Sequence, residues 1–144
     1  MPVPALSEII ENFALLDEWD DRYRYLIELG RTLDPLSPDA HNEDNRVRGC
    51  ASQVWIETHV DGAASPGPVL KFLGDSDAHI VRGLVALTLS LYSGQTAKTI
   101  LSTNAFDTFE ELDLASHLTP QRSNGVRAMI ERIRADASKA LEQA

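Results

Sequence analysis

Apolar positions recur at helical spacing in two stretches near the start of the chain. The first predicts a helix from about Leu6, with Ser7 as its candidate cap. Its inward-facing positions are Ile9, Ile10, Phe13 and Leu16. The second predicts a helix that Asp17 caps and that stops at Gly30 and Arg31. Acidic residues crowd the start of this second helix, where the positive end of the helix dipole stabilises them, so they need no binding role.

The pattern changes in the middle of the chain. Residues 32–49 contain prolines and asparagines without an apolar period, which indicates a long irregular loop. Apolar and polar positions then alternate over residues 53–60, which predicts a β-strand. Residues 61–68 are rich in Gly and Pro and break it, and residues 69–73 predict a second short strand, so we expect a hairpin. Residues 74–77 end that strand and offer several helix caps.

The next part of the chain is helical. Apolar residues between positions 80 and 91 cover much of a helix surface, which predicts that this helix is central in the fold. Gly94 closes it, and Thr96 is the candidate cap of a short helix through Leu101. Residues 106–112 predict another short helix.

The last helix opens at Thr119 and Pro120. Its apolar residues form one stripe that we expect to pack on the core, made of Val126, Met129, Ile130, Ile133, Ala137 and Leu141. The order of helices, hairpin and helices predicts an α+β fold in which a small antiparallel sheet packs against helices. Since no repeat or linker interrupts the chain, we expect residues 1–144 to form a single domain.

Composition narrows the possible functions. The chain has 144 residues and a net charge of −9, which argues against a nucleic acid partner because phosphate binding needs clustered Lys and Arg. One cysteine cannot form an intrachain disulfide and supplies too few thiolates for a zinc ribbon or an iron–sulfur cluster. The start of the chain has no basic signal region, and the most apolar stretch, residues 83–92, is about half of a membrane span. We therefore expect a cytoplasmic protein with no membrane partner.

Cys50 is the main candidate for chemistry. Most lone cysteines in cytosolic proteins are small buried hydrophobes. This thiol instead follows a polar loop, Gly49 permits an unusual backbone beside it, and Arg46 and Arg48 place positive charge nearby. Positive charge favours the nucleophilic thiolate. The alternative for the two arginines is ordinary surface solvation.

Other sites are weaker candidates. A cysteine–histidine hydrolase is conceivable, with His41, His59, His79 or His117 as the base, but no peptidase signature surrounds the cysteine. The histidines lack ligand spacing, so we expect no metal site. Residues 74–77 could bind an anion at a helix start, although their two acids favour capping. Residues 119–125 have the same two interpretations, and Arg122 favours function there.

The residues around Cys50 also resemble a known motif. Residues 45–55, Asn-Arg-Val-Arg-Gly-Cys-Ala-Ser-Gln-Val-Trp, are similar to the active loop of the SufE/CsdE sulfur-acceptor proteins, roughly Val-x-Gly-Cys-x-Ser-x-Val-Trp. Matches at residues 25–30, 74–78, 80–83 and 117–123 follow the same order. The resemblance covers almost the whole chain, and one of its five segments contains the only cysteine.

This resemblance implies a function for a single thiol. In the family, the matching cysteine accepts sulfane sulfur from the persulfide of a PLP-dependent cysteine desulfurase of the SufS/CsdA type, stimulates it, and passes the sulfur to the iron–sulfur scaffold machinery. PLP belongs to that partner, so we expect no cofactor in this chain. The implied fold is SufE/IscU-like. Cluster scaffolds of that fold use several cysteines, so one cysteine indicates a sulfur carrier rather than a scaffold. The resemblance implies a sulfur-transfer partner of a desulfurase rather than a stand-alone enzyme. The alternative is an adaptor that activates a desulfurase allosterically without carrying sulfur.

The resemblance also implies roles for residues around Cys50. Asp77 matches a family aspartate that affects the opening of the cysteine loop, and Arg122 matches an arginine near that loop. Ser52, Gln53 and His117 fall in matching motifs, while turn polarity, strand surface and loop packing are their respective alternatives. Arg46 and Arg48 replace residues that are often uncharged in the family. Together with Gly49, these residues are the expected partner-binding or loop-supporting set.

Overall fold

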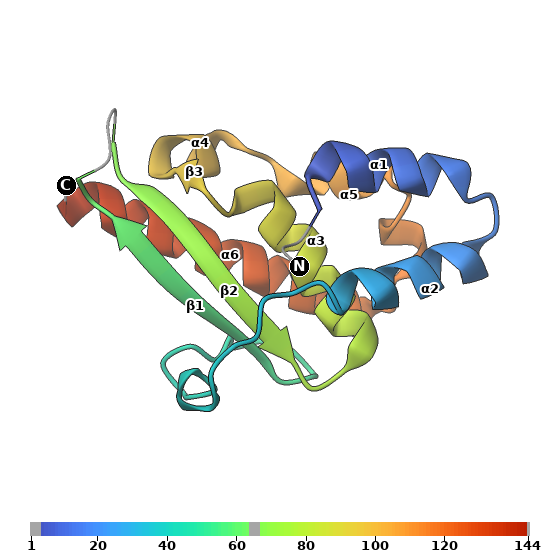
Figure 1. Cartoon of the computed structure of the whole chain (residues 1–144), viewed down its shortest axis with the longest axis horizontal. Coiled ribbons are helices and arrows are strands. Elements are labelled where there is room, and N and C mark those ends of the chain that lie inside the picture. The colour runs from blue at the N-terminus through green and yellow to red at the C-terminus, as the bar shows by residue number, and fades with distance from the viewer. Residues whose placement is uncertain (1–3, 64–66, 144) are drawn as a thin grey trace.

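The computed structural model describes residues 4–63 and 67–143 (Figure 1). The elements follow in the order α1 (Leu6–Leu15), α2 (Trp19–Gly30), the 3₁₀ turn η1 (Pro38–Ala40), β1 (Val54–Asp61), β2 (Val69–Ser76), α3 (His79–Tyr92), β3 (Gln95–Thr96), α4 (Ala97–Ser102), α5 (Ala105–Glu111), the 3₁₀ turn η2 (Ala115–His117) and α6 (Pro120–Gln143). The predicted α+β class is confirmed, since the strands form one antiparallel sheet in the order β1-β2-β3.

The hairpin of β1 and β2 is longer than the sequence predicts. Val54 lies opposite Ser76 and Asp61 opposite Val69, so β2 continues past Leu73, where we expected it to end. Residues 74–76 continue the ladder because their backbone groups pair with the start of β1. Gly74 suits this position, because a Cβ there would come within 2.7 Å of Val85 on α3.

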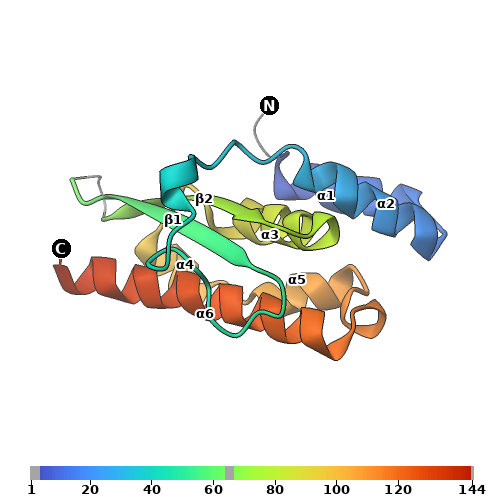
Figure 2. The ribbon, with the colours of Figure 1, turned by 90° about the horizontal axis from the view of Figure 1, so that it is seen from below.

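Helix α3 is the centre of the molecule, as predicted. Most of its residues are buried, including Leu84, Val85 and Leu87. Figure 2 shows α1 and α2 on one side of α3 and the long helix α6 on the other, beneath the sheet. Helices α2 and α3 cross closely at Gly30 and Gly83. A Cβ on Gly83 would collide with the carbonyl oxygen of Leu26. Within the described ranges, no helix is long and apolar enough to cross a membrane.

The predicted helix starts are partly wrong. Residues Ala5 and Glu18 precede α1 and α2 without a side-chain cap, so Ser7 and Asp17 are not caps. Helix α3 follows Ala78, again without a side-chain cap, because the polar residues before it make other contacts. The tertiary hydrogen bonds of those side chains have outweighed their local capping preference.

Two other predicted starts are confirmed. Thr96 Oγ1 accepts a hydrogen bond from the Thr99 amide at the start of α4. Thr119 Oγ1 accepts one from the Arg122 amide at the start of α6. The predicted stripe of α6 is buried except for Leu141, which is partly buried. This stripe holds the first turns of α6 against the core, beside the cysteine loop.

Candidate functional site

Cys50 lies on a loop whose first end is joined to the sheet. The Val47 amide donates to the Val54 carbonyl at 2.8 Å, and the Ile56 amide donates to the Asn45 carbonyl at 2.8 Å. Val47 and Val54 are both buried. Residues 45–47 therefore pair with the start of β1, and residues 48–53 form the loop that we call the cysteine loop.

The backbone of this loop requires a glycine next to Cys50. Gly49 has φ = 92°, in the left-handed region that residues with a Cβ rarely adopt. A Cβ at this position would lie 3.4 Å from Ala128 Cβ on α6. The unusual backbone that the sequence allows is present, and it turns the chain toward α6.

The second end of the cysteine loop is held by Asp77. Its Oδ1 accepts a hydrogen bond from the Gln53 amide at 3.1 Å, and its own amide donates to the Gln53 carbonyl at 3.3 Å. Asp77 and Gln53 are both exposed. The structure thus places these two expected loop-supporting residues together: Gln53 just before β1, and Asp77 in the connection between β2 and α3.

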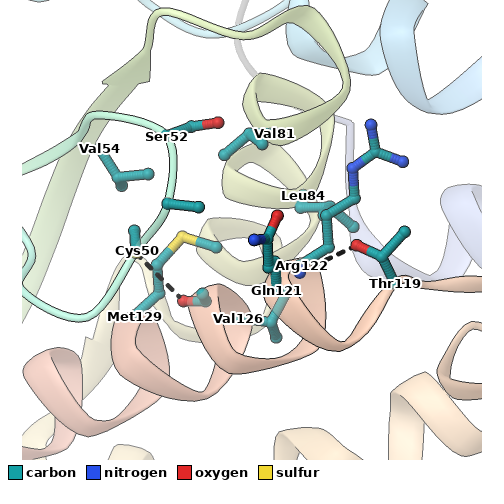
Figure 3. A pocket seen from close by; sticks show the side chains of 12 residues that line it. Cys50, Ser52, Val54, Val81, Leu84, Thr119, Gln121, Arg122, Val126 and Met129 are labelled. Atoms are coloured by element: carbon teal, nitrogen blue, oxygen red, sulfur yellow. Dashed lines mark hydrogen bonds between the residues drawn. The ribbon is translucent and has the colours of Figure 1, made fainter.

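A cavity of about 230 Å³ opens beside the thiol (Figure 3). Its lining residues come from the cysteine loop and β1, from α3, and from the start of α6: Cys50, Ala51, Ser52, Val54, Val81, Leu84, Thr119, Gln121, Arg122, Gly125, Val126 and Met129. Figure 3 shows Cys50 and Ser52 at one side and Gln121 and Arg122 on the first turn of α6 at the other. The cavity therefore has apolar walls between two polar sides.

The surroundings of Cys50 favour its protonated thiol over the thiolate. The side chain is half-buried, and its S–H donates to the Gly125 carbonyl at 3.5 Å. Loss of hydration raises the pKa of the Cys50 thiol, and the charge of Arg46 opposes that shift only in part. Arg46 favours the thiolate, as expected from the sequence, but burial has the larger and opposite effect on the pKa of Cys50.

The two arginines before Cys50 share one carboxylate. Glu43 lies 3.7 Å from Arg46 Nη1 and 3.4 Å from Arg48 Nη2. The Arg48 side chain is 80% exposed and is not among the groups that shift the pKa of Cys50. Arg48 thus stands on the surface at the start of the cysteine loop, and its part in binding a partner stays a prediction.

Arg122 and His117 have different surroundings. Arg122 lines the cavity, and its guanidinium points away from Cys50 and lies 5.8 Å from the ring centroid of Tyr23 on α2 (Figure 3). His117 stacks on Trp19 with 3.9 Å between ring centroids. In the part of the chain that the structure describes, no histidine lines the cavity of Cys50. This arrangement does not support a cysteine–histidine hydrolase.

Two of the other histidines, His41 and His59, have carboxylate neighbours outside the cavity. His41 Nε2 lies 2.8 Å from Asp75 Oδ2, and this carboxylate raises the pKa of His41. His59 Nε2 lies 2.6 Å from Glu57 Oε1. Residues 4–63 and 67–143 contain no group of three or more His, Cys, Asp or Glu side chains that could hold a metal ion.

Gly125 is a site residue that we did not single out from the sequence. A Cβ there would lie 3.6 Å from Cys50 Sγ, so the bare backbone of α6 lets the thiol approach its carbonyl. The signal available was a glycine inside a helix, which lowers helix stability and so calls for a packing reason. Met129, one turn further on, was predicted as core, and it also lines the cavity.

The fold and the site together define a small α+β protein that presents one thiol from a loop at the edge of a cavity. Residues 7–137 match the model of the SufE family, described as an Fe-S metabolism associated domain. The chain belongs to the SufE family, which associates it with iron–sulfur metabolism.

Relatives support this assignment. The chain is 50% identical over 133 residues to an uncharacterized SufE-like protein of Rhizobium etli, covering 92% of this chain and 89% of that protein. It is 51% identical over 133 residues to an uncharacterized SufE-like protein of Rhizobium meliloti strain 1021, covering 92% and 94%. The solution structure of a hypothetical protein from Thermus thermophilus has the same fold, with a TM-score of 0.74, 23% identity and 99% of each chain covered.

Proposed function

We propose that this protein accepts sulfane sulfur on Cys50 from the persulfide of a PLP-dependent cysteine desulfurase of the SufS/CsdA type, and relays it to iron–sulfur cluster assembly. The observation that carries the proposal is the only cysteine of a SufE-family chain, placed on a glycine-turned loop at the edge of a cavity. PLP acts in the desulfurase, and this chain contributes the accepting thiol.

The transfer is a thiol exchange that needs no oxidant. The Cys50 thiolate attacks the outer sulfur of the donor persulfide and forms a new S–S bond. The S–S bond of the donor breaks, and its electron pair leaves with the donor cysteine as a thiolate. The transferred sulfur is then the outer atom of a persulfide on Cys50, ready for a second exchange with an acceptor thiol.

The resting geometry implies that the partner must expose the thiol. Cys50 is half-buried and burial raises its pKa, whereas the attacking group must be accessible and ionised. The two hydrogen bonds between Asp77 and Gln53 are exposed at one end of the loop. We expect docking to break them and to move Cys50 out toward the donor.

The experiment is to incubate the protein with a SufS/CsdA-type desulfurase and cysteine, and to measure both intact mass and desulfurase turnover. Wild type should gain one sulfur atom and stimulate turnover, and Cys50→Ser should do neither. Ala63→Ser, on the exposed hairpin turn, is the control and should behave as wild type. If wild type gains no sulfur while Cys50→Ser still stimulates normally, the sulfur-acceptor function is wrong.

One observation favours a second function. Burial raises the pKa of the Cys50 thiol, and its S–H donates to the Gly125 carbonyl, which is also how a packed, unreactive cysteine would look. In that case the protein is an adaptor that activates the desulfurase allosterically. Full stimulation by Cys50→Ser, with a stable complex and no sulfur on the wild type, identifies the adaptor.

A further inference from the structure

Arg122 differs from the other two arginines near the cysteine loop. Arg46 and Arg48 lie close to Glu43, which offsets part of their charge. Within residues 4–63 and 67–143, no carboxylate lies within ion-pair distance of Arg122, and its guanidinium is over the face of Tyr23. Arg122 thus places a positive charge at the edge of the cavity, on the side away from Cys50, and no side-chain carboxylate of the described residues offsets it.

Tyr23 belongs to an aromatic pair on α2. Trp19 and Tyr23 are four residues apart in this helix, so they share one face, and that face meets the segment before α6. Trp19 stacks on the ring of His117 at 3.9 Å and an interplanar angle of 20°. His117 Nδ1 in turn lies 3.0 Å from the carbonyl oxygen of Asp113.

These contacts fix the place where α6 begins. His117 ends η2 and Pro120 begins α6, so the stack on Trp19 holds the chain just before the first turn of the helix. Arg122 lies in that first turn, and its amide donates to Thr119 Oγ1 at 3.2 Å. Both the backbone and the guanidinium of Arg122 are therefore positioned by α2, which contributes no residue to the cavity lining.

We propose that Trp19, Tyr23 and His117 form an aromatic seat that positions Arg122 to receive an anionic sulfur group arriving at the Cys50 cavity. This inference rests on the proposed function, because the arriving group is then the donor persulfide in its ionised form. A guanidinium that stacks on a ring keeps its N–H edges available for an anion. Arg46 acts on the Cys50 thiol itself, and Arg122 acts on the incoming group.

Two alkylating reagents of nearly equal size test the seat without a desulfurase. Iodoacetate is an anion and iodoacetamide is neutral, and both alkylate the Cys50 thiolate. The ratio of their rate constants cancels changes in loop opening and in thiolate fraction, which affect both reagents alike. The ratio therefore reports only how strongly the protein attracts or repels an anion that approaches Cys50.

The seat predicts a set of changes in this ratio, iodoacetate over iodoacetamide. Arg122→Gln should lower it about threefold and Tyr23→Leu about twofold, because one positive charge is removed or displaced. Tyr23→Phe keeps the ring and should keep the wild-type ratio. The matched control is Tyr25→Leu on the same helix, because that ring packs edge-on against Phe13 and its hydroxyl accepts from Asn12. It should leave the ratio unchanged.

A double variant separates positioning from general loosening. In the Arg122→Gln background, Tyr23→Leu should cause no further fall, since Tyr23 acts through Arg122. An unchanged ratio in folded Tyr23→Leu, an equal fall in Tyr25→Leu, or a further fall in the double variant overturns the seat. Arg122→Lys, which leaves α2 intact and keeps the charge but replaces the planar guanidinium over Tyr23, should also lower the ratio.

Sulfur loading by the desulfurase separates this inference from the proposed function. If the seat acts in transfer, Tyr23→Leu and Arg122→Gln should each load Cys50 about two- to threefold more slowly, and Tyr25→Leu should load as wild type. If the wild type gains no sulfur, the proposed function is wrong. The ratio of the two alkylation rates still tests whether the aromatic seat positions Arg122. If Tyr23→Leu loads Cys50 at the normal rate but has a lowered alkylation ratio, the seat positions Arg122 and has no role in sulfur transfer.

Discussion

The two ends of the cysteine loop are held in different ways. At the first end, Val47 and Val54 are buried and joined by a backbone hydrogen bond, as part of the sheet. At the second end, Asp77 and Gln53 are exposed and joined by two polar hydrogen bonds. Buried apolar contacts contribute to global stability, whereas exposed hydrogen bonds open locally at small cost. We therefore expect the loop to open at its second end while its first end stays in place.

The largest effect is expected from the buried end. Val54→Ala should lower the free energy of unfolding by about 2 kcal/mol, because it leaves a cavity in the core. Urea unfolding measures this loss. Val60→Ala, on the same strand but 51% exposed, is the matched control and should cost less than about 0.5 kcal/mol. Equal losses in both variants would mean that the first end is not held by burial.

Gly49 should show the next largest effect. Gly49→Ala places a Cβ at φ = 92° and should cost about 1 kcal/mol of stability. Gly62→Ala is the control, since a Cβ at Gly62 would meet no atom within 4 Å and its φ is not in the left-handed range. Thermal unfolding of the two variants side by side measures the difference. If Gly49→Ala is as stable as Gly62→Ala, the left-handed turn is not required.

Asp77 should change the reactivity of the thiol more than the stability of the fold. Asp77→Ala removes the acceptor for the Gln53 amide, so the loop opens more often and iodoacetamide should alkylate Cys50 about threefold faster. The cost in unfolding free energy should stay below about 1 kcal/mol. Asp61→Ala is the control, because Asp61 also accepts one exposed backbone amide, that of Ala63. If Asp77→Ala is alkylated no faster than the control, the cysteine loop does not open at Asp77.

The smallest effect is a dependence on pH at the first end. Asp75 raises the pKa of His41, whose ring also packs edge-on against Trp55. A raised pKa in the folded state means that protonated His41 stabilises the fold below about pH 6.5, its ordinary pKa, and that this contribution is lost as pH rises through the folded pKa. The difference in unfolding free energy between wild type and His41→Gln should therefore shrink from pH 5.5 to pH 8.5, by about 0.5 kcal/mol. A constant difference would contradict the ion pair.

The sequence predicted the elements whose pattern is local. The central helix follows from the apolar surface of residues 80–91, and the start of α6 follows from Thr119 and Pro120. Prediction from the sequence failed where residues distant in the chain compete for one polar group. Asp77 has the local signature of a helix cap, but its carboxylate accepts from the Gln53 amide at the second end of the cysteine loop, 24 residues earlier in the chain.

The site was predicted only in part for the same reason. Cys50 and its loop stand out because one cysteine, one glycine and two arginines are close in sequence. The direction of the shift in the pKa of Cys50 depends on burial against α6, and no local pattern reports that. The contact between Arg122 and Tyr23 joins two helices from opposite ends of the chain, so only the folded structure reveals it.

The length of the hairpin also has a practical consequence. The strands run from the cysteine loop at Val54 to Asp61 and Val69 at the other end of the sheet (Figure 1). Eight residues of extended chain span about 25 Å. A fluorophore or an affinity handle attached at Gly62, which is exposed, therefore stands well away from the only natural thiol. The protein can be tethered there to a surface with the Cys50 cavity left accessible, so the proposed sulfur transfer can be tested on single molecules.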